Sequence, residues 1–264
     1  MSQASGVVVY QMGKVGSSTV HRTLREARLP VPVYKTHYLS DEGVARARRL
    51  YANLRTSVPL PHEQTVDRLR ETLRTVGVPP WKVITLVREP VARDVSAYLQ
   101  MVDVLHPQIV GDDRTPRRAA RAATAQFLSF DEHRNYTCTW FDVELKAALG
   151  VDVFAQPFDH TAGCVRLRRG DLEVLVLRTE DLDSHGAETI SDFLGVRVPL
   201  RHASSRAPDK LQSVYTEDIY RQVVSRVRLP EPVCRRIYSS RYARHFYLDE
   251  ERERFIAKWS GPRP

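Results

Sequence analysis

Three groups of residues in this sequence combine a turn with side chains that bind anions or move protons. The first is the stretch VVVYQMGKVGSSTVHRTL, residues 7–24, in which Lys14 stands between Gly13 and Gly16 and three hydroxyl side chains follow. The first N–H groups of a helix have no intrahelical acceptor and lie at the positive end of the helix dipole. A strand that ends in such a glycine turn and continues as a helix predicts a phosphate-binding loop.

The residue order of this loop differs from the Walker A pattern, G-x-x-x-x-G-K-[ST], because Lys14 precedes the second glycine instead of following it. Lys14 would therefore stand before the anion-binding turn, where it can reach a bridging oxygen. The anion itself would be held by consecutive residues, Lys14, Val15, Gly16, Ser17, Ser18 and Thr19. Taken alone, the loop leaves an alternative open, in which the glycines form an ordinary tight turn and Lys14 is solvated.

The other two groups lie where two further strands are predicted to end. In ITLVREPVARDVSAY, Arg88 stands at the carboxyl end of the strand 81–87, and Ser96 follows two helical turns later on the exposed face of the next helix. An arginine in this place can hold a phosphate through two parallel N–H bonds. The second predicted strand spans residues 31–39, and its end, YKTHYL, carries His37. Carboxyl ends of parallel strands share one edge of a sheet, so we expect these groups to face the same ligand.

The elements that position these groups follow from apolar runs and from glycine and proline punctuation. Strands alternate with helices through the first two thirds of the chain, and the Arg-Gly-Asp turn at 169–171 separates two more strands. This order predicts an α/β fold with a P-loop-like, mainly parallel sheet flanked by helices. We expect a single domain over residues 1–264, with a largely helical C-terminal part from about residue 205 to 264.

Three other segments carry weaker signals. The Arg/Ala-rich stretch 114–126 is expected to be an exposed helix or a loop with a solvated basic face, and 139–150 a helix closed by Gly150. Residues 151–158, VDVFAQPF, favour a strand or an edge segment.

Composition limits the class of protein. The chain has 264 residues, 42% hydrophobic and 27% charged, with a formal net charge of +8. These values indicate a globular protein with a field that favours anionic ligands, but the basic excess is too small and too scattered to predict nucleic-acid binding. The 3 cysteines form no CxxC pair, and the sequence shows no metal-ligand cluster, signal peptide or long apolar run. We expect a cytoplasmic protein without stable membrane insertion and leave its oligomeric state open.

Several side chains are lesser candidates. Glu180 and Asp181 could orient a substrate hydroxyl or act as a base, but a helix-capping pair is the favoured interpretation. His133 could lie near an acceptor pocket, although the interpretation that it does not is favoured. Trp140 and Phe141 are expected to be core residues rather than a platform for a ligand.

Taken together, these motifs resemble the sulfotransferases that use 3′-phosphoadenosine 5′-phosphosulfate (PAPS). QMGKVGSST is similar to their 5′-phosphosulfate loop, LVREPVARDVSAY to their 3′-phosphate motif, and YKTHYL to the strand that carries the catalytic histidine in the cytosolic branch. The segments 139–159, 174–182 and 229–247 look like a bacterial group of capsular polysaccharide synthesis proteins, itself sulfotransferase-like. The matching stretches span most of the chain.

The resemblance implies transfer of a sulfuryl group from PAPS to an acceptor hydroxyl on a carbohydrate or small metabolite, with 3′-phosphoadenosine 5′-phosphate (PAP) as product. Lys14 would stabilise the bridging oxygen, and His37, with an unperturbed pKa near 6.5, would be the general base. Arg88 and Ser96 would select the 3′-phosphate. The transferred group carries less charge than a γ-phosphoryl group, so this scheme requires no metal.

Two departures from the family leave the adenine pocket open. Many family members have a tryptophan directly after the paired hydroxyl residues, where this chain has Thr19 and Val20. The C-terminal Arg-Lys-Gly of the cytosolic enzymes is missing, and Arg241 and Arg244 stand in a comparable late position without an assigned role.

Two other classes of function remain as alternatives. A P-loop nucleotide-dependent kinase would use a similar strand, loop and helix, but the displaced lysine and the lack of a strand ending in a clear Mg²⁺-binding aspartate disfavour it. A non-enzymatic polyanion-binding protein would explain the net charge alone, and would leave the three motifs at the strand ends unexplained.

Overall fold

A computed structural model describes residues 6–52, 63–75, 81–105, 115–199 and 217–262 of the chain. The chain divides into two compact units. The first comprises residues 1–88 and 140–202, and the second comprises residues 89–139 and 203–264. The single domain expected over residues 1–264 stays a prediction.

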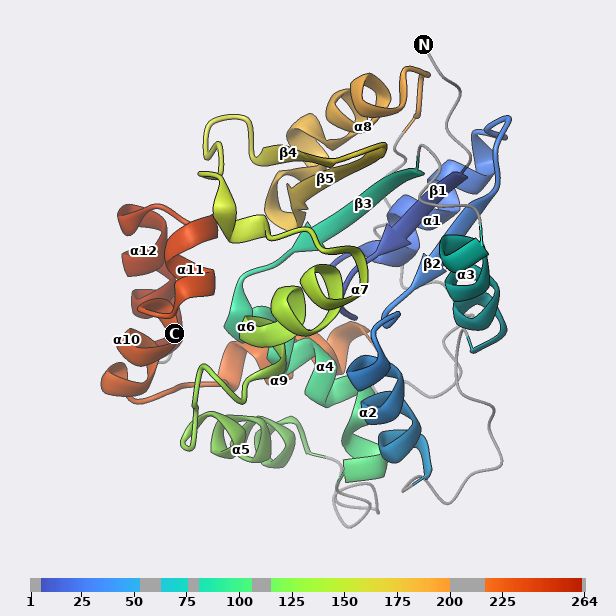
Figure 1. The fold of residues 1–264 in the computed structure, drawn as a ribbon. Coiled ribbons are helices and arrows are strands. Elements are labelled where there is room, and N and C mark those ends of the chain that lie inside the picture. The colour runs from blue at the N-terminus through green and yellow to red at the C-terminus, as the bar shows by residue number, and fades with distance from the viewer. Residues whose placement is uncertain (1–5, 53–62, 76–80, 106–114, 200–216, 263–264) are drawn as a thin grey trace. The chain divides into compact units, whose positions relative to one another are not determined.

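The first unit is built on a five-stranded sheet with the order β2-β1-β3-β5-β4 (Figure 1). Its strands are β1 (Gly6–Tyr10), β2 (Val33–Thr36), β3 (Trp81–Val87), β4 (Cys164–Arg169) and β5 (Leu172–Arg178). All neighbouring strands are parallel except β4 and β5, which form an antiparallel hairpin. The sheet confirms the predicted α/β class.

Strand β1 lies between β2 and β3, and every one of its residues is buried. The chain passes from β1 to β2 on one side and then crosses to β3 on the other, so that Val9 pairs with both Lys35 and Ile84. In α/β sheets, ligands bind beyond the carboxyl ends of strands where the direction of winding reverses in this way. The fold therefore brings the ends of the three predicted motif strands together at such a point.

The helices of the first unit follow from their sequence patterns. α1 (Ser17–Glu26) buries Val20 and Leu24 and packs against β1 and β2. The other helices of this unit are α2 (Asp41–Ala52), α3 (Glu63–Thr75), α7 (Ala147–Leu149) and α8 (Ala187–Leu194). Short helical turns follow β5, namely η4 (Thr179–Asp181) and η5 (Leu182–Gly186).

The helix predicted over 139–150 is present but not uniform. It consists of α6 (Tyr136–Trp140), a π-helical stretch η2 (Phe141–Lys146) and α7, and it ends at Gly150. The sequence did not predict the π-helical stretch. Such stretches insert an extra residue into a turn and occur often at functional sites.

The strand or edge segment predicted over 151–158 is wrong. The described structure has a 3₁₀ turn, η3 (Val153–Ala155), because the Asp152 carboxylate accepts a hydrogen bond of 3.0 Å from the N–H of Phe154. The other oxygen of Asp152 forms an ion pair of 2.7 Å with Lys146. A local bond from an aspartate side chain to the backbone thus competes successfully with strand formation.

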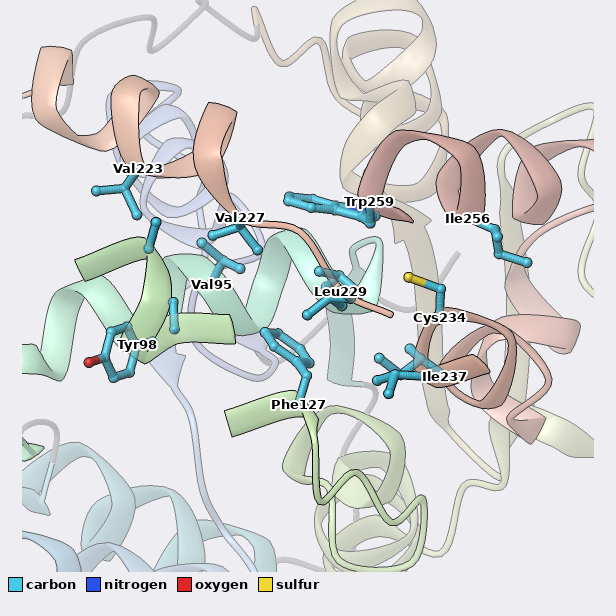
Figure 2. Close-up of a cluster of buried hydrophobic side chains, with 14 of the residues drawn as sticks. Val95, Tyr98, Phe127, Val223, Val227, Leu229, Cys234, Ile237, Ile256 and Trp259 are labelled. Atoms are coloured by element: carbon cyan, nitrogen blue, oxygen red, sulfur yellow. The ribbon is translucent and has the colours of Figure 1, made fainter. Parts of the chain in front are cut away.

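The second unit is helical in its described parts. It contains α4 (Pro90–Leu105), α5 (Pro116–Phe127), most of α6, α9 (Glu217–Arg226), α10 (Glu231–Tyr238), α11 (Arg241–Phe246) and α12 (Asp249–Ser260). Its core gathers side chains from α4, α5, α9, α10 and α12 around Leu229 and Trp259 (Figure 2). The helices after residue 217 confirm the helical C-terminal part, and residues 205–216 lie outside the described residues.

Helix α5 refines the expectation for the Arg/Ala-rich stretch. Arg117, Arg118 and Arg121 are exposed, as a solvated basic face requires. The opposite face is buried through Ala119, Ala120 and Ala123 and belongs to the core of the second unit, against α9. Thr115 caps the helix by accepting a bond from the N–H of Arg118. The stretch is therefore a packed amphipathic helix and not a loop.

None of the helices in the described ranges combines the length and apolar character needed to cross a lipid bilayer.

Candidate anion-binding site at the sheet edge

The loop after β1 has a left-handed backbone at two positions, which strains the non-glycine residue Lys14 but not Gly16. Lys14 has φ of 71° and Gly16 has φ of 85°, both in the left-handed region. This conformation costs a non-glycine residue roughly 1–2 kcal/mol, and a side chain at residue 16 would also approach Leu182 Cδ1 to 3.2 Å. Strain of this kind persists only where surrounding contacts hold it, and it is typical of ligand-binding turns.

Two side chains from neighbouring strand ends hold this loop. The guanidinium of Arg88, after β3, donates a hydrogen bond of 2.9 Å from Nη1 to the carbonyl of Lys14. The hydroxyl of Thr179, after β5, lies 2.8 Å from the carbonyl of Val15 and 2.7 Å from that of Val87. The expected proximity of the first and third strand ends is confirmed by the Arg88 contact. Thr179 was not among the predicted residues.

The N-terminus of α1 carries no side-chain cap. Gly16 occupies the N-cap position and has no side chain to accept a bond from the first-turn N–H groups. Thr19 and Val20 direct their N–H groups to the carbonyl of Gly16, which leaves Ser17 and Ser18 as the first-turn residues whose N–H groups have no helical acceptor. This is the arrangement that an anion completes.

The helix that follows β3, α4, differs in this respect. The carboxylate of Glu89 accepts bonds from the N–H groups of Val91 (2.7 Å) and Ala92 (3.0 Å) and so caps the helix. It also accepts a bond of 3.1 Å from Trp259 Nε1 and one from the Tyr238 hydroxyl. Burial raises the pKa of the Glu89 carboxyl, and these donors oppose part of that rise. The N-terminus of α4 is therefore already filled by a protein carboxylate.

The hydroxyl side chains of the loop differ in accessibility. Ser17 is buried and Thr19 half-buried, whereas Ser18 is exposed and accepts a bond of 3.1 Å from Lys35 Nζ. Lys35, on β2, is thus a second cation beside the loop and was missed. A signal was available, because Lys35 and His37 are two residues apart and alternate residues of an extended segment share a side.

The ring of His37 is held by the backbone of β1. Its Nδ1 lies 2.8 Å from the carbonyl oxygen of Gln11. A carbonyl can only accept a hydrogen bond, so Nδ1 carries the proton and Nε2 is the basic nitrogen of the neutral ring. The carbonyl of His37 itself accepts a bond of 3.1 Å from Trp140 Nε1. In this tautomer the ring would accept a proton at Nε2.

Gln11 also has a side chain that sequence reasoning missed. It is fully buried, and neither its amide oxygen nor its amide nitrogen has a hydrogen-bond partner among the described residues. An unsatisfied buried polar group costs about 1–3 kcal/mol. Unpaired polar atoms at this depth, one residue after β1, mark Gln11 as a candidate ligand contact.

Ser96 belongs to α4 in the second unit, whereas Arg88 belongs to the first. The expectation that Ser96 lies on an exposed face is wrong, because the side chain is 4% exposed. Its contact with a 3′-phosphate stays a prediction. His133 is exposed in the second unit, and so are Arg241 and Arg244.

The lesser acidic and aromatic candidates have structural contacts. Asp181 forms an ion pair with Arg178, and its side chain accepts no capping hydrogen bond from the helix N–H groups, so the helix-capping interpretation is wrong for it. Trp140 and Phe141 are buried, as expected of core residues. In the described part of the chain, no group of three or more His, Cys, Asp or Glu side chains could hold a metal ion.

Comparison with known proteins places a similarity in the later half of the chain. Residues 129–248 match the model of a family described as "Putative capsular polysaccharide synthesis protein". The match covers the β4–β5 hairpin, Thr179 and several helices of the second unit, but not the loop at 13–19, His37 or Arg88. A search of curated proteins found no match. The evidence for the anion-binding loop therefore comes from its own geometry.

Proposed function

We propose that this protein is a sulfotransferase of polysaccharide biosynthesis, which moves a sulfuryl group from PAPS to an acceptor hydroxyl. The observation that carries the proposal is one sheet edge with two complementary parts. An uncapped helix N-terminus lies beside Lys14 and Lys35, and His37 follows the adjacent strand with Nε2 as its basic nitrogen. The first part suits a phosphosulfate and the second suits an acceptor hydroxyl.

The donor would bind with its 5′-phosphate and sulfonate at the N-terminus of α1. The N–H groups of Ser17 and Ser18 and the hydroxyls of the loop would donate hydrogen bonds to it. Lys14 would lie beside the oxygen that joins phosphorus to sulfur, where negative charge grows as the bond to sulfur breaks. Lys35, already bonded to Ser18, would place a second positive charge next to the same group.

Transfer would begin when His37 Nε2 accepts the proton of the acceptor hydroxyl. The acceptor oxygen would attack sulfur in line with the departing oxygen, the new S–O bond would form as the old one breaks, and PAP would leave with the electron pair. The bond from Nδ1 to the Gln11 carbonyl would keep the ring oriented and stabilise the imidazolium that forms. General-base catalysis of this kind typically contributes about 10²–10⁴ in rate.

The 3′-phosphate distinguishes PAP from ADP, and Arg88 is the residue we assign to it. A guanidinium has five N–H donors, and one of them, on Nη1 of Arg88, donates to the Lys14 carbonyl. Arg88 would therefore couple nucleotide recognition to the shape of the loop.

The acceptor is proposed to be a hydroxyl of a carbohydrate. The similarity of residues 129–248 to a capsular polysaccharide synthesis family supports a polysaccharide. A small metabolite remains a second kind of acceptor to test. The proposal requires neither a metal nor nucleic acid, and we place the protein in the cytoplasm.

A thermal-shift comparison tests the donor site. PAP without Mg²⁺ is expected to raise the midpoint of unfolding, since a ligand at 100 times its Kd adds about 2.7 kcal/mol to the stability of the folded state. ADP is expected to have little effect. Stabilisation by ADP with Mg²⁺ and none by PAP would favour a kinase, which the uncapped α1 N-terminus would also suit. Stabilisation by polyanions alone would favour a non-enzymatic binding protein.

Mass spectrometry tests the reaction. The protein is incubated with PAPS and a mixed library of oligosaccharides and small hydroxyl compounds, and the products are searched for the gain of one SO₃ group. A Lys14→Ala variant serves as the matched control. Products formed equally by both proteins would contradict the assigned site.

A further inference from the structure

The segment that carries His37 is tied to the π-helical stretch η2 and the residue before it. Trp140 Nε1 donates a bond of 3.1 Å to the carbonyl of His37. Glu144 Oε2 accepts bonds from the N–H groups of Leu39 (2.8 Å) and Ser40 (3.0 Å). We call Trp140 and Glu144 the loop clamp. Together they hold three backbone groups within four consecutive residues, all inside the first unit.

The carboxylate of the clamp is buried, and its Oε2 accepts several hydrogen bonds. Glu144 is 2% exposed, and its Oε2 also accepts a hydrogen bond from the hydroxyl of Tyr10, the last residue of β1. Burial raises the pKa of the Glu144 carboxyl, and the donors oppose part of that rise. An apolar residue of similar size would avoid this desolvation cost. Its presence is therefore better explained by the geometry that it imposes than by stability.

The surrounding fold is shaped to admit this carboxylate. A side chain at Gly43, in the first turn of α2, would collide with Glu144 Oε1. The N–H of Gly43 instead donates a bond of 2.8 Å to Ser40 Oγ. Helix α2 begins at Asp41, directly after this serine. Strand β1, helix α2 and stretch η2 thus converge on one side chain.

His37 is fixed from two directions by these contacts. The Gln11 carbonyl holds the ring through Nδ1, and the loop clamp holds the backbone at and after His37. We propose that Glu144 is a positioning residue for His37, which fixes the backbone segment from which the imidazole reaches the acceptor. The expected effect of Glu144 on kcat rests on the proposed function. Its expected effect on the position and tautomer of His37 does not.

The structural consequence can be measured without any reaction. In ¹⁵N-labelled protein, the two ring nitrogens of His37 report the tautomer. At a pH where the ring is neutral, the wild-type protein is expected to show a protonated Nδ1 and an unprotonated Nε2. In Glu144→Leu, which keeps about the size of the side chain but removes the oxygen that accepts from Leu39, Ser40 and Tyr10, we expect the two nitrogen shifts to move toward those of a mixture of tautomers.

The kinetic consequence has a matching signature. Because misplacement of a catalytic group by about 1 Å can cost about 10²-fold in rate, kcat for Glu144→Leu should fall by about that factor. The Kd for PAP should stay within about twofold, since the bonds that Glu144 accepts come from Tyr10, Leu39 and Ser40. In a His37→Ala background, Glu144→Leu should cause no further loss, because residues that act as one unit are not additive.

Ser191→Ala is the control for lost stability. It removes bonds of Ser191 Oγ with the Ala187 carbonyl and the Val198 N–H, in the same unit but not in segment 37–40. It should lower the midpoint of unfolding and leave the His37 spectrum and kcat unchanged. If Glu144→Leu does not fold, Tyr10→Phe takes its place, because it removes only the hydroxyl that donates to Glu144. The same direction of change in the His37 shifts is then expected.

Unchanged His37 nitrogen shifts in the folded variant would overturn the inference, and so would an equal loss of kcat with and without His37. A different result would contradict the proposed function. If the wild-type protein sulfates no acceptor, the proposed function fails, and the nitrogen shifts alone decide whether Glu144 positions His37.

Discussion

Arg88 donates a hydrogen bond of 2.9 Å to the backbone carbonyl of Lys14, so the end of β3 directly supports the left-handed turn after β1. Through this bond the side chain assigned to the 3′-phosphate also maintains the shape of the loop assigned to the 5′-phosphosulfate. In the proposed nucleotide site, one guanidinium would therefore couple the two ends.

Arg88→Ala should weaken PAP binding by about 10- to 150-fold, because a hydrogen bond to a charged group is worth about 1.5–3 kcal/mol. Arg88→Lys keeps the charge but not the planar donor geometry, and should bind with intermediate affinity. Isothermal titration calorimetry with PAP measures both. Equal affinities in the wild type and in Arg88→Ala would exclude the assignment.

Thr179→Val tests the second anchor of the loop. The variant keeps the shape of the side chain and removes the hydroxyl that contacts the carbonyls of Val15 and Val87. PAP affinity should fall by about 2- to 12-fold, as expected for a neutral hydrogen bond of about 0.5–1.5 kcal/mol. Thr179→Ser should restore the affinity. A Thr179→Ser variant as weak as Thr179→Val would show that packing, and not the hydroxyl, holds the loop.

His37→Ala should keep the Kd for PAP and lower the rate of sulfuryl transfer by about 10²–10⁴-fold, the usual contribution of a general base. The control is His185→Ala, since His185 is an exposed histidine of the same unit. Normal turnover by His37→Ala would mean that another group removes the acceptor proton.

The strands and the loop were predictable because their signals are local. β1 is a continuous buried apolar run, as strands covered on both faces usually are, and the turn that follows is marked by its glycines. The order of elements then led to a parallel sheet, and a parallel sheet implies that the ends of β1, β2 and β3 share an edge. Lys14, Arg88 and His37 could be placed at that edge without coordinates.

The supports of the site could not be predicted, since they come from distant parts of the chain. Thr179 and Glu144 are more than 100 residues from the segments that they hold. Ser96 is buried although its position in the sequence indicated an exposed helix face. The error over 151–158 has a different origin, because a single side chain, Asp152, redirects a backbone that its apolar residues would have extended. The spacing of apolar residues along the sequence does not show such contacts between side chains and backbone.

Gln11→Leu should separate stability from function. The amide of Gln11 is buried without a partner among the described residues, and replacing it with an apolar side chain should raise the free energy of unfolding by about 1–2 kcal/mol. If the amide contacts a ligand, turnover or the KM for the acceptor should worsen in the same variant. Urea denaturation and steady-state kinetics measure the two effects. Increased stability with unchanged kinetics would show that the amide has no ligand.

Stability should depend on pH through Glu89. Burial raises the pKa of this carboxyl above its ordinary value of 4.5, so the folded protein keeps the proton to higher pH than the unfolded chain does. The contribution of Glu89 to stability is then fully present below the unfolded pKa and is lost as pH rises through the folded pKa. Glu89→Gln has no proton to lose, and its amide cannot accept all four donors that surround the carboxylate.

The variant should therefore be less stable at every pH, but its deficit relative to the wild type should shrink as pH rises from about 4.5 toward neutrality. Urea denaturation of both proteins across this range measures the difference, in which the other titrating groups largely cancel. A deficit that grows with pH would mean that the four donors lower the pKa of Glu89 by more than burial raises it. Glu89 would then stabilise the start of α4 as a carboxylate at neutral pH, directly after the residue assigned to the 3′-phosphate.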